Sequence, residues 1–206
     1  MKKKKYNEQE KFWSEKFGMN YSNRDNHDPI KSLDYLFTNI FKKNKIKISN
    51  LLEFGPNIGN NIKSIRTIYP KSKITTVEIN KYACNKLKKI KNLKIINDTI
   101  TNFDEKDKYD VVLIKNVLIH INPNSLKSVY KKIFESSNNY ICIIEYFNPS
   151  PVKVNYRGYK NKLFKRDFCR EIMSKYKRLK LIDYGFVYKY DPIYPCDNIN
   201  WFLLKK

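Results

Sequence analysis

The chain has 206 residues, with 42 Lys and Arg against 20 Asp and Glu, which gives a formal net charge of +22. This length fits one α/β domain and is too short for two domains of ordinary size. Hydrophobic residues make up 41% of the chain and aromatic residues 15%, which excludes wholesale disorder. No apolar run approaches the roughly 18 residues of a membrane span, and the lysine-rich start lacks the apolar segment of a secretory signal. We therefore expect a cytoplasmic protein that does not insert into a membrane.

The positive charge is spread along the whole chain and comes mostly from lysine, with 36 Lys against 6 Arg. Asn and Ile each occur 25 times and Ala occurs once, a joint bias that AT-rich codons produce. Proteins that read phosphates or bases usually rely on Arg, whose planar group grips both. The composition therefore favours codon bias, and not a dedicated nucleic-acid-binding surface, as the origin of the positive charge. A basic surface also attracts small anionic substrates.

The four cysteines, Cys84, Cys142, Cys169 and Cys196, are widely spaced in the chain. Neither they nor the two histidines form a cluster with the spacing of metal ligands. We expect reduced, unpaired thiols and no metal site.

The pattern of apolar residues predicts an N-terminal helical cap over residues 1–45 and a core over residues 46–206. In the cap, helices are expected over 7–19 and 28–43, with Asp28 as N-cap and Pro29 at the first helical position. In the core, strands are expected over 48–54, 73–77, 93–96, 109–114, 140–146, 179–188 and 200–204, helices over 62–69, 81–90, 123–134 and 164–176, and a loop rich in Pro and Tyr after residue 146. Continuous apolar strands indicate an α/β fold with a doubly wound, mostly parallel seven-stranded sheet, which binds ligands at the carboxyl ends of its strands.

The loop after the first strand carries two of the five glycines, Gly55 and Gly59. They allow a tight turn and a close approach of the helix start to a ligand. A dinucleotide fingerprint would need glycine where the chain has Asn57 and Asn60, so a bound pyrophosphate is disfavoured. The loop is similar instead to the acidic, glycine-rich loop of class I methyltransferases that use S-adenosylmethionine, with Asn57 replacing the middle glycine. In that comparison the Glu53 carboxylate would complement the cationic end of the cofactor, directly or through water.

Polar residues also follow the next three strands. Glu78 ends the second strand, where a carboxylate can accept hydrogen bonds from both ribose hydroxyls. Asp98 follows the third strand, where such methyltransferases often place an acid near adenine, and Asn116 follows the fourth, beneath the methyl donor. The predicted cofactor-binding residues are Glu53, Phe54, Gly55, Pro56, Asn57, Gly59, Glu78, Ile79, Asp98, Thr99 and Asn116.

Residues 115–123 occupy the position where such enzymes present catalytic or substrate-binding groups. The N/D-P-P-Y/F tetrapeptide of nucleic-acid amino methylases is absent from this segment. His120 is suited to act as a general base near neutral pH, and the alternative is a structural histidine bound to a backbone group.

Taken together, these residues resemble the methyltransferases associated with pseudaminic acid biosynthesis, within the class I superfamily. The resemblance rests on four stretches, which are Phe12-Trp13 with Phe17-Gly18, Tyr21 and Arg24; residues 52–59; residues 117–123; and residues 145–149 continuing to 156–158 and 163–168. It implies a Rossmann-like fold, S-adenosylmethionine as cofactor with S-adenosylhomocysteine as product, and a small anionic acceptor. That acceptor would be a nine-carbon sugar acid, its nucleotide-activated form or a precursor amino sugar.

The resemblance also suggests roles for residues outside the cofactor loop. The candidate substrate-binding residues are Arg24, Tyr156, Arg157, Lys165 and Arg166. The Arg and Lys side chains among them can pair with a carboxylate or phosphate. Structural roles for residues 156–168 are the alternative. His120 is the first candidate for the base, followed by Tyr21 or Tyr146.

The sequence therefore predicts an S-adenosylmethionine-dependent N- or O-methyltransferase of a small molecule, as a monomer or homodimer. Three rival interpretations remain at this point. The protein would be an RNA or DNA methyltransferase that uses its basic surface, a non-catalytic partner protein that binds the cofactor, or a nicotinamide oxidoreductase.

Overall fold

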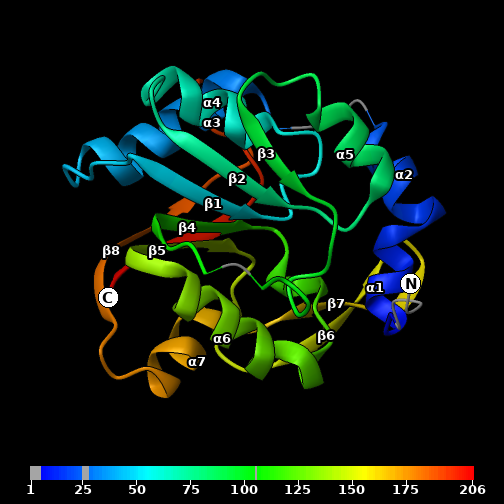
Figure 1. Ribbon diagram of the computed structural model, residues 1–206. Helices are drawn as coiled ribbons and strands as arrows, with labels where there is room; N and C mark the ends of the chain where they lie inside the picture. The colour runs from blue at the N-terminus through cyan, green and yellow to red at the C-terminus, as the bar shows by residue number, and fades with distance from the viewer. Residues whose placement is uncertain (1–5, 25–27, 105) are drawn as a thin grey trace.

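The computed structural model describes residues 6–24, 28–104 and 106–206, which fold into a twisted central sheet with helices on both faces (Figure 1). The α-helices are α1 (Glu8–Ser14), α2 (Lys16–Ser22), α3 (Ile30–Phe37), α4 (Asn60–Ile68), α5 (Lys81–Leu87), α6 (Leu126–Ser136) and α7 (Phe168–Lys175). The strands are β1 (Asn50–Phe54), β2 (Lys73–Val77), β3 (Leu93–Ile96), β4 (Tyr109–Lys115), β5 (Ser137–Glu145), β6 (Val152–Tyr156), β7 (Tyr159–Lys165), β8 (Lys180–Val187) and β9 (Ile199–Lys205). A π-helical turn, Thr38–Lys42, extends α3, and 3₁₀ turns at Leu118–His120 and Pro123–Ser125 precede α6.

Seven strands form the main sheet in the order β3-β2-β1-β4-β5-β9-β8, and β6 and β7 form a separate hairpin. The first five strands of this order run parallel, and β9 joins them antiparallel between β5 and β8. The order reverses between β1 and β4, which opens a crevice at the carboxyl ends of these two strands. The sequence prediction of a doubly wound, mostly parallel sheet of seven strands is confirmed.

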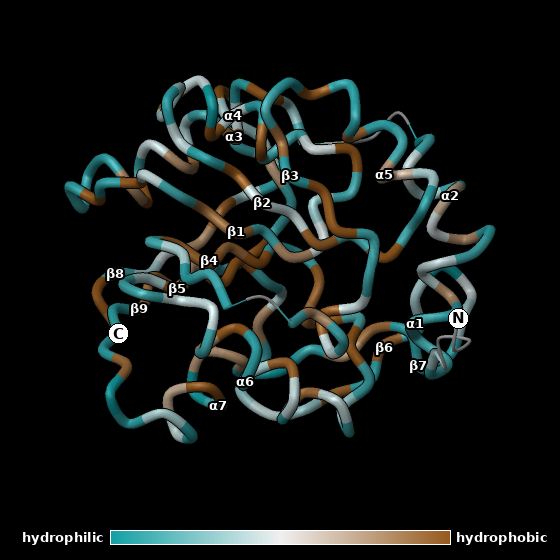
Figure 2. Tube along the Cα trace, in the orientation of Figure 1, coloured by the Kyte–Doolittle hydropathy of each residue, from teal (hydrophilic) through white to brown (hydrophobic). Residues whose placement is uncertain are grey.

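Two apolar cores hold the layers together. One core joins α3, α4 and α5 to one face of the sheet, and the other joins α6 and α7 to the opposite face. The strands between them, such as β4 with Val111 to Ile114 fully buried, contribute side chains to both cores. Figure 2 shows this pattern as hydrophobic residues concentrated in the central strands and hydrophilic residues along the outer turns.

Three local predictions from the sequence are wrong. The expected loop after residue 146 contains the β6–β7 hairpin, whose tight turn at Arg157 and Gly158 places both residues at positive φ, 51° and 84°. The last helix begins at Phe168 rather than at residue 164, because residues up to Lys165 belong to β7. The first helix is two helices, with a break at Glu15.

The N-terminal cap also differs in detail from its prediction. Helix α3 begins at Ile30 with Pro29 as its N-cap residue, so Asp28 does not cap it. The Asp28 carboxylate instead pairs with Lys115, far away in the sequence. Residues 1–5 and 25–27 of the predicted cap lie outside the described residues.

The described segments contain no helix that is long and apolar enough to cross a membrane. The four cysteine side chains are buried and form no disulfide bonds. Among the same residues, no group of three or more His, Cys, Asp or Glu side chains lies close enough together to hold a metal ion.

Candidate functional site

A deep cavity lies at the carboxyl edge of the sheet, over the ends of β1 to β4. It holds about 1290 Å³ of empty space, a volume that includes the open solvent at its mouth. The loops after the four strands form its floor, and residues of α1 and α2 form its cover. In Figure 1 these two helices lie beside the carboxyl ends of the strands, next to the β6–β7 hairpin. The cavity is therefore a covered crevice at the topological switch point of the sheet.

The glycine loop brings backbone close to the cavity. Gly55 has φ of +69°, and a Cβ atom there would collide with the Val117 side chain. Gly59 has φ of +86° and is the N-cap residue of helix α4, so both glycines are required by the backbone path. Asn57 adopts φ of 51°, a left-handed conformation that asparagine tolerates better than most residues. Its side-chain oxygen lies 2.6 Å from the Ser22 hydroxyl of helix α2, which ties the loop to the cover.

Glu78, directly after β2, presents a buried carboxylate to the cavity. One oxygen accepts a hydrogen bond from the backbone N–H of Asn80 at 2.7 Å, and the other from the N–H of Asn57 at 3.0 Å. Each oxygen keeps lone pairs for a further donor. Burial raises the pKa of Glu78 above its ordinary value, against the lowering effect of these hydrogen bonds. The carboxylate is thus fixed in place with capacity to bind two more donors.

The predicted residues after β3 and β4 also line this cavity. Asp98 accepts a hydrogen bond from the Thr99 backbone N–H at 2.7 Å, and both residues face the same space as Ile79. Asn116 has φ of 55°, and its side-chain oxygen is buried without a hydrogen-bond partner among the described residues. A buried polar atom without a partner is rare in proteins, and at a cavity wall it marks a place where a ligand can donate a hydrogen bond.

Three of the predicted cofactor-binding residues, Glu53, Phe54 and Gly59, lie behind the cavity wall. Glu53 and Phe54 are fully buried, and Glu53 accepts a hydrogen bond of 2.6 Å from Asn61, which does line the cavity. Burial raises the pKa of Glu53 to about 7, only partly offset by the Asn61 hydrogen bond and by the charge of Lys115. Glu53 therefore stands one layer below the surface that a ligand would touch.

His120 sits in an aromatic cluster at the other side of the cavity. Its ring centroid lies 4.5 Å from that of Trp13 and 4.8 Å from that of Tyr156, while its Nδ1 lies 2.7 Å from the backbone oxygen of Lys162. Burial lowers the pKa of His120 to about 4, with a smaller lowering by the charge of Arg24 and an opposing effect of the Lys162 carbonyl. The imidazole is therefore neutral at pH 7.

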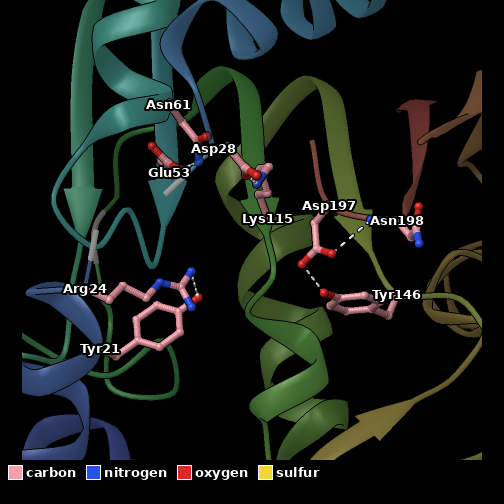
Figure 3. Close-up of polar contacts among 9 residues, drawn as sticks. All are labelled: Tyr21, Arg24, Asp28, Glu53, Asn61, Lys115, Tyr146, Asp197 and Asn198. Carbon is pink, nitrogen blue, oxygen red and sulfur yellow. Dashed lines mark hydrogen bonds and ion pairs between the residues drawn. The ribbon is translucent and has the colours of Figure 1, made fainter. Parts of the chain in front are cut away.

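Arg24 and Tyr21, both from the cover, also line the cavity. The Arg24 guanidinium carbon lies 3.6 Å from the Tyr21 ring centroid, and its Nη2 donates to the Tyr21 hydroxyl at 2.7 Å (Figure 3). The Nε atom of Arg24 and the indole Nε1 of Trp13 are buried donors with no partner in the described part of the chain. Arg157, at the tip of the hairpin, does not line the cavity itself, although its guanidinium carbon lies 5.9 Å from the centroid of the same Tyr21 ring.

The remaining predicted residues lie away from the cavity wall. The Tyr156 ring contacts that of His120 at an interplanar angle of 58°. Tyr146 donates a hydrogen bond to Asp197, and the Lys165 Nζ lies 5.0 Å from the centroid of the Tyr146 ring. Arg166 pairs with Glu171 at 2.6 Å, beside a separate shallow groove between α6 and α7. The structure therefore brings His120, Tyr21 and Arg24 together and leaves Tyr146, Lys165 and Arg166 apart.

Sequence reasoning missed Trp13, Asn61, Asp28 and Lys115 as cavity residues. The best signal was Lys115, which directly follows the continuous apolar run of β4 and so places a cation at the end of a buried strand. Trp13 gave a weaker signal, because its spacing to Phe17 fits an ordinary helix face.

The sequence matches no family model and no curated protein. Solved structures match the fold. Magnesium protoporphyrin IX methyltransferase from Synechocystis, solved with bound S-adenosylmethionine, superposes with a TM-score of 0.68 at 9% identity and covers 98% of this chain and 99% of its own.

Two further structures were solved with S-adenosylhomocysteine. The O-methyltransferase of a trans-AT PKS multienzyme of Brevibacillus brevis has a TM-score of 0.64 and 16% identity, covering 85% of this chain and 71% of its own. The 1,6-didemethyltoxoflavin N1-methyltransferase of Burkholderia thailandensis has a TM-score of 0.64 and 9% identity, covering 86% and 77%. The chain therefore has the Rossmann-like fold of class I S-adenosylmethionine-dependent methyltransferases.

Proposed function

We propose that the protein transfers a methyl group from S-adenosylmethionine to a nitrogen or oxygen atom of a small anionic acceptor. The observation that carries this proposal is the row of ligand-binding groups at the carboxyl ends of adjacent strands. The Gly55 loop, the Glu78 carboxylate and Asp98 follow β1, β2 and β3 and line one cavity. The fold is shared with methyltransferases that were solved with this cofactor or its product.

The cavity residues fit S-adenosylmethionine better than a dinucleotide. The N–H of Asn57, which a pyrophosphate would need, is already bound to the Glu78 carboxylate, and that negative charge repels phosphate. The same carboxylate suits two ribose hydroxyls, and Asp98 with Thr99 suits the amino group of adenine. The unpaired oxygen of Asn116 provides a further acceptor beside them. Glu53 would act only through Asn61, because it does not reach the cavity.

In the reaction, the residues of this chain position the acceptor and take its proton. S-adenosylmethionine supplies an electrophilic methyl group when it is bound. The hydrogen bond to the Lys162 carbonyl keeps the proton on Nδ1 of His120, so that Nε2 has a lone pair for the acceptor proton. The rings of Trp13 and Tyr156 pack against the imidazole and exclude water from it.

The acceptor side of the cavity favours an anionic, hydroxylated molecule. Arg24 provides a fixed cation, and its Nε and the Trp13 Nε1 are buried donors that a carboxylate or hydroxyl oxygen would satisfy. Arg157 lies outside the cavity wall and places a second cation near it, 5.9 Å from the Tyr21 ring. These groups support the acceptor class that the sequence resemblance implies, a sugar acid or an amino or nucleotide sugar of pseudaminic acid-type glycan biosynthesis.

The test is incubation of the purified protein with S-adenosylmethionine and a panel of sugar acids, amino sugars and nucleotide sugars, read by mass spectrometry. We expect one anionic member of the panel to gain about 14 mass units, the mass of one methylene. Binding of S-adenosylhomocysteine without methylation of any acceptor would support instead a non-catalytic cofactor-binding protein. Methylation of an RNA oligonucleotide with steep salt dependence would contradict the small-molecule acceptor.

A further inference from the structure

An ion pair between Asp28 and Lys115 lies in the cavity wall and has no role in the function described above. The Lys115 Nζ lies 2.5 Å from the Asp28 Oδ2, and the two side chains are 6% and 22% exposed. Lys115 is the last residue of β4, and Asp28 precedes helix α3. Both residues line the cavity that Glu78 and Asp98 line. Figure 3 shows the pair between the Glu53–Asn61 contact and the Tyr146–Asp197 contact.

Both members of the pair are charged. Burial is the largest influence on the pKa of Asp28 and would raise it, but the charge and hydrogen bond of Lys115, with further hydrogen bonds from Cys196 and the Asp197 backbone, hold this pKa below its ordinary value. Burial is the largest influence on the pKa of Lys115 and would lower it, but the charge and hydrogen bond of Asp28, together with the charges of Cys196 and Tyr21, leave this pKa above its ordinary value. An ammonium group has three N–H donors, and Asp28 is the one hydrogen-bond partner of the Lys115 ammonium within the described ranges.

The order of the strands decides which part of a bound nucleoside would reach this pair. Asp98 follows β3, Glu78 follows β2 and Lys115 ends β4, and the strands lie side by side as β3-β2-β1-β4. An adenosyl group held by Asp98 and Glu78 therefore extends over the end of β1 toward Lys115. The substituent on its ribose 5′ carbon is the part that points to the ion pair.

We propose that Asp28 and Lys115 form the binding site for the zwitterionic amino-acid end of S-adenosylmethionine, with Lys115 binding the carboxylate and Asp28 the ammonium group. This inference rests on the proposed function, because it presumes that the adenosyl group occupies the cavity. The chemistry is complementary, since the ligand presents one negative and one positive group on the same carbon and the wall presents one of each, 2.5 Å apart.

The pair also explains how the site avoids an unpaired buried charge. A lone buried cation would repel the positively charged sulfonium and would cost free energy to bury. An ion pair of Lys and Asp has no net charge, so it avoids both effects. It also keeps each group oriented before the ligand arrives. Glu53, the acid that the sequence comparison assigned to this end of the cofactor, is fully buried behind Asn61. Asp28 is the carboxylate that reaches the cavity there.

The experiment compares the affinities of two ligands by isothermal titration calorimetry. S-adenosylhomocysteine carries the amino-acid end, whereas 5′-methylthioadenosine lacks it. The proteins are the wild type, Lys115→Met, the charge-neutral double variant Asp28→Asn with Lys115→Met, and Lys131→Met as a control that removes an exposed lysine on α6. The ratio of the two dissociation constants is measured within each protein, so a general loss of folded protein cancels.

We expect the wild type and Lys131→Met to prefer S-adenosylhomocysteine by more than about tenfold, as charge-assisted hydrogen bonds allow. In Lys115→Met and in the double variant, the preference should fall by about tenfold or more while 5′-methylthioadenosine binds as before. An equal loss of affinity for both ligands would overturn the inference and leave the proposed function standing. Absence of binding of either ligand to the wild type would overturn the proposed function itself.

Discussion

The imidazole Nδ1 of His120 lies 2.7 Å from the backbone carbonyl oxygen of Lys162. A carbonyl oxygen only accepts hydrogen bonds, so Nδ1 donates and Nε2 keeps its lone pair. His120 follows β4, whereas Lys162 belongs to the β6–β7 hairpin. The hairpin therefore fixes the tautomer of the residue that we propose as the base.

Replacement of this base should separate chemistry from cofactor binding. His120→Ala should lower kcat by about 100-fold, the order of magnitude of general base catalysis, and leave the affinity for S-adenosylhomocysteine within about twofold. The measurement is steady-state methyl transfer to the acceptor that the panel identifies, together with calorimetry. Equal kcat values for the variant and the wild type would remove His120 from the mechanism.

The protonation state of His120 can be followed without an acceptor. Because burial lowers its pKa to about 4, we expect its ring resonances not to titrate between pH 8 and pH 5.5 in NMR spectra. The unfolded state takes up the proton near pH 6.5 and the folded state only near pH 4, so this residue makes the protein less stable as pH falls through that window. His120→Ala identifies the resonances by their loss. A midpoint near 6.5 would show that the ring is open to solvent.

Arg24 should contribute to acceptor binding and not to cofactor binding. Its guanidinium is fixed against Tyr21 and lines the cavity, so Arg24→Met should raise the KM of an anionic acceptor by about tenfold or more. The affinity for S-adenosylhomocysteine should stay unchanged. Arg66→Met is the matched control, because Arg66 lies on helix α4, donates a hydrogen bond to the backbone oxygen of Asn92 and does not line the cavity. A rise in KM of the same size in both variants would argue against the assigned role.

Glu145 should make the stability of the fold depend on pH. One of its oxygens accepts hydrogen bonds from the backbone N–H groups of Val117 and Leu118, and the other has no partner among the described residues. Burial raises its pKa to about 8, despite these hydrogen bonds. The folded state therefore keeps a proton that the unfolded state loses above pH 4.5, and stability falls as pH rises from 4.5 to 8.

Glu145→Gln cannot ionise and should escape this loss. The quantity to measure is the difference in Tm, variant minus wild type, at pH 5 and at pH 8.5. We expect this difference to be larger at pH 8.5 by at least about 3 °C, since 1 kcal/mol corresponds to roughly 2–4 °C in a protein of this size. The amide nitrogen adds a cost that does not depend on pH. A difference that stays constant across this range would show that Glu145 is ionised in the folded protein.

Most of the fold could be predicted because its strands are continuous and apolar. Strands β2 and β3 have the bounds that the sequence predicted, and the glycine loop falls where the crevice opens. The β6–β7 hairpin was missed because Val152 and Val154 are exposed, so the strand has no buried apolar run to reveal it. Its turn uses Arg157 at positive φ, where sequence rules favour asparagine or aspartate.

The position of two predicted site residues follows from local sequence. Glu78 and Asp98 come directly after strands and line the cavity, because the position after a parallel strand is a property of the fold, while their binding of the cofactor stays a prediction. Asp28 was misread as a helix cap, since its actual partner Lys115 lies 87 residues away and no local pattern links the two. Glu53 lies behind Asn61 because its side chain points to the face of the sheet that helix α4 covers, which a motif cannot report.

The central claim is that this cavity holds an adenosyl methyl donor. Calorimetric titration of the purified protein with S-adenosylhomocysteine tests it most directly, with NADH as the rival ligand. We predict that titration with S-adenosylhomocysteine releases or absorbs heat that saturates at one ligand per protein. Titration with NADH should produce no binding heat. Heat with NADH, and none with either S-adenosylmethionine or S-adenosylhomocysteine, would contradict the account.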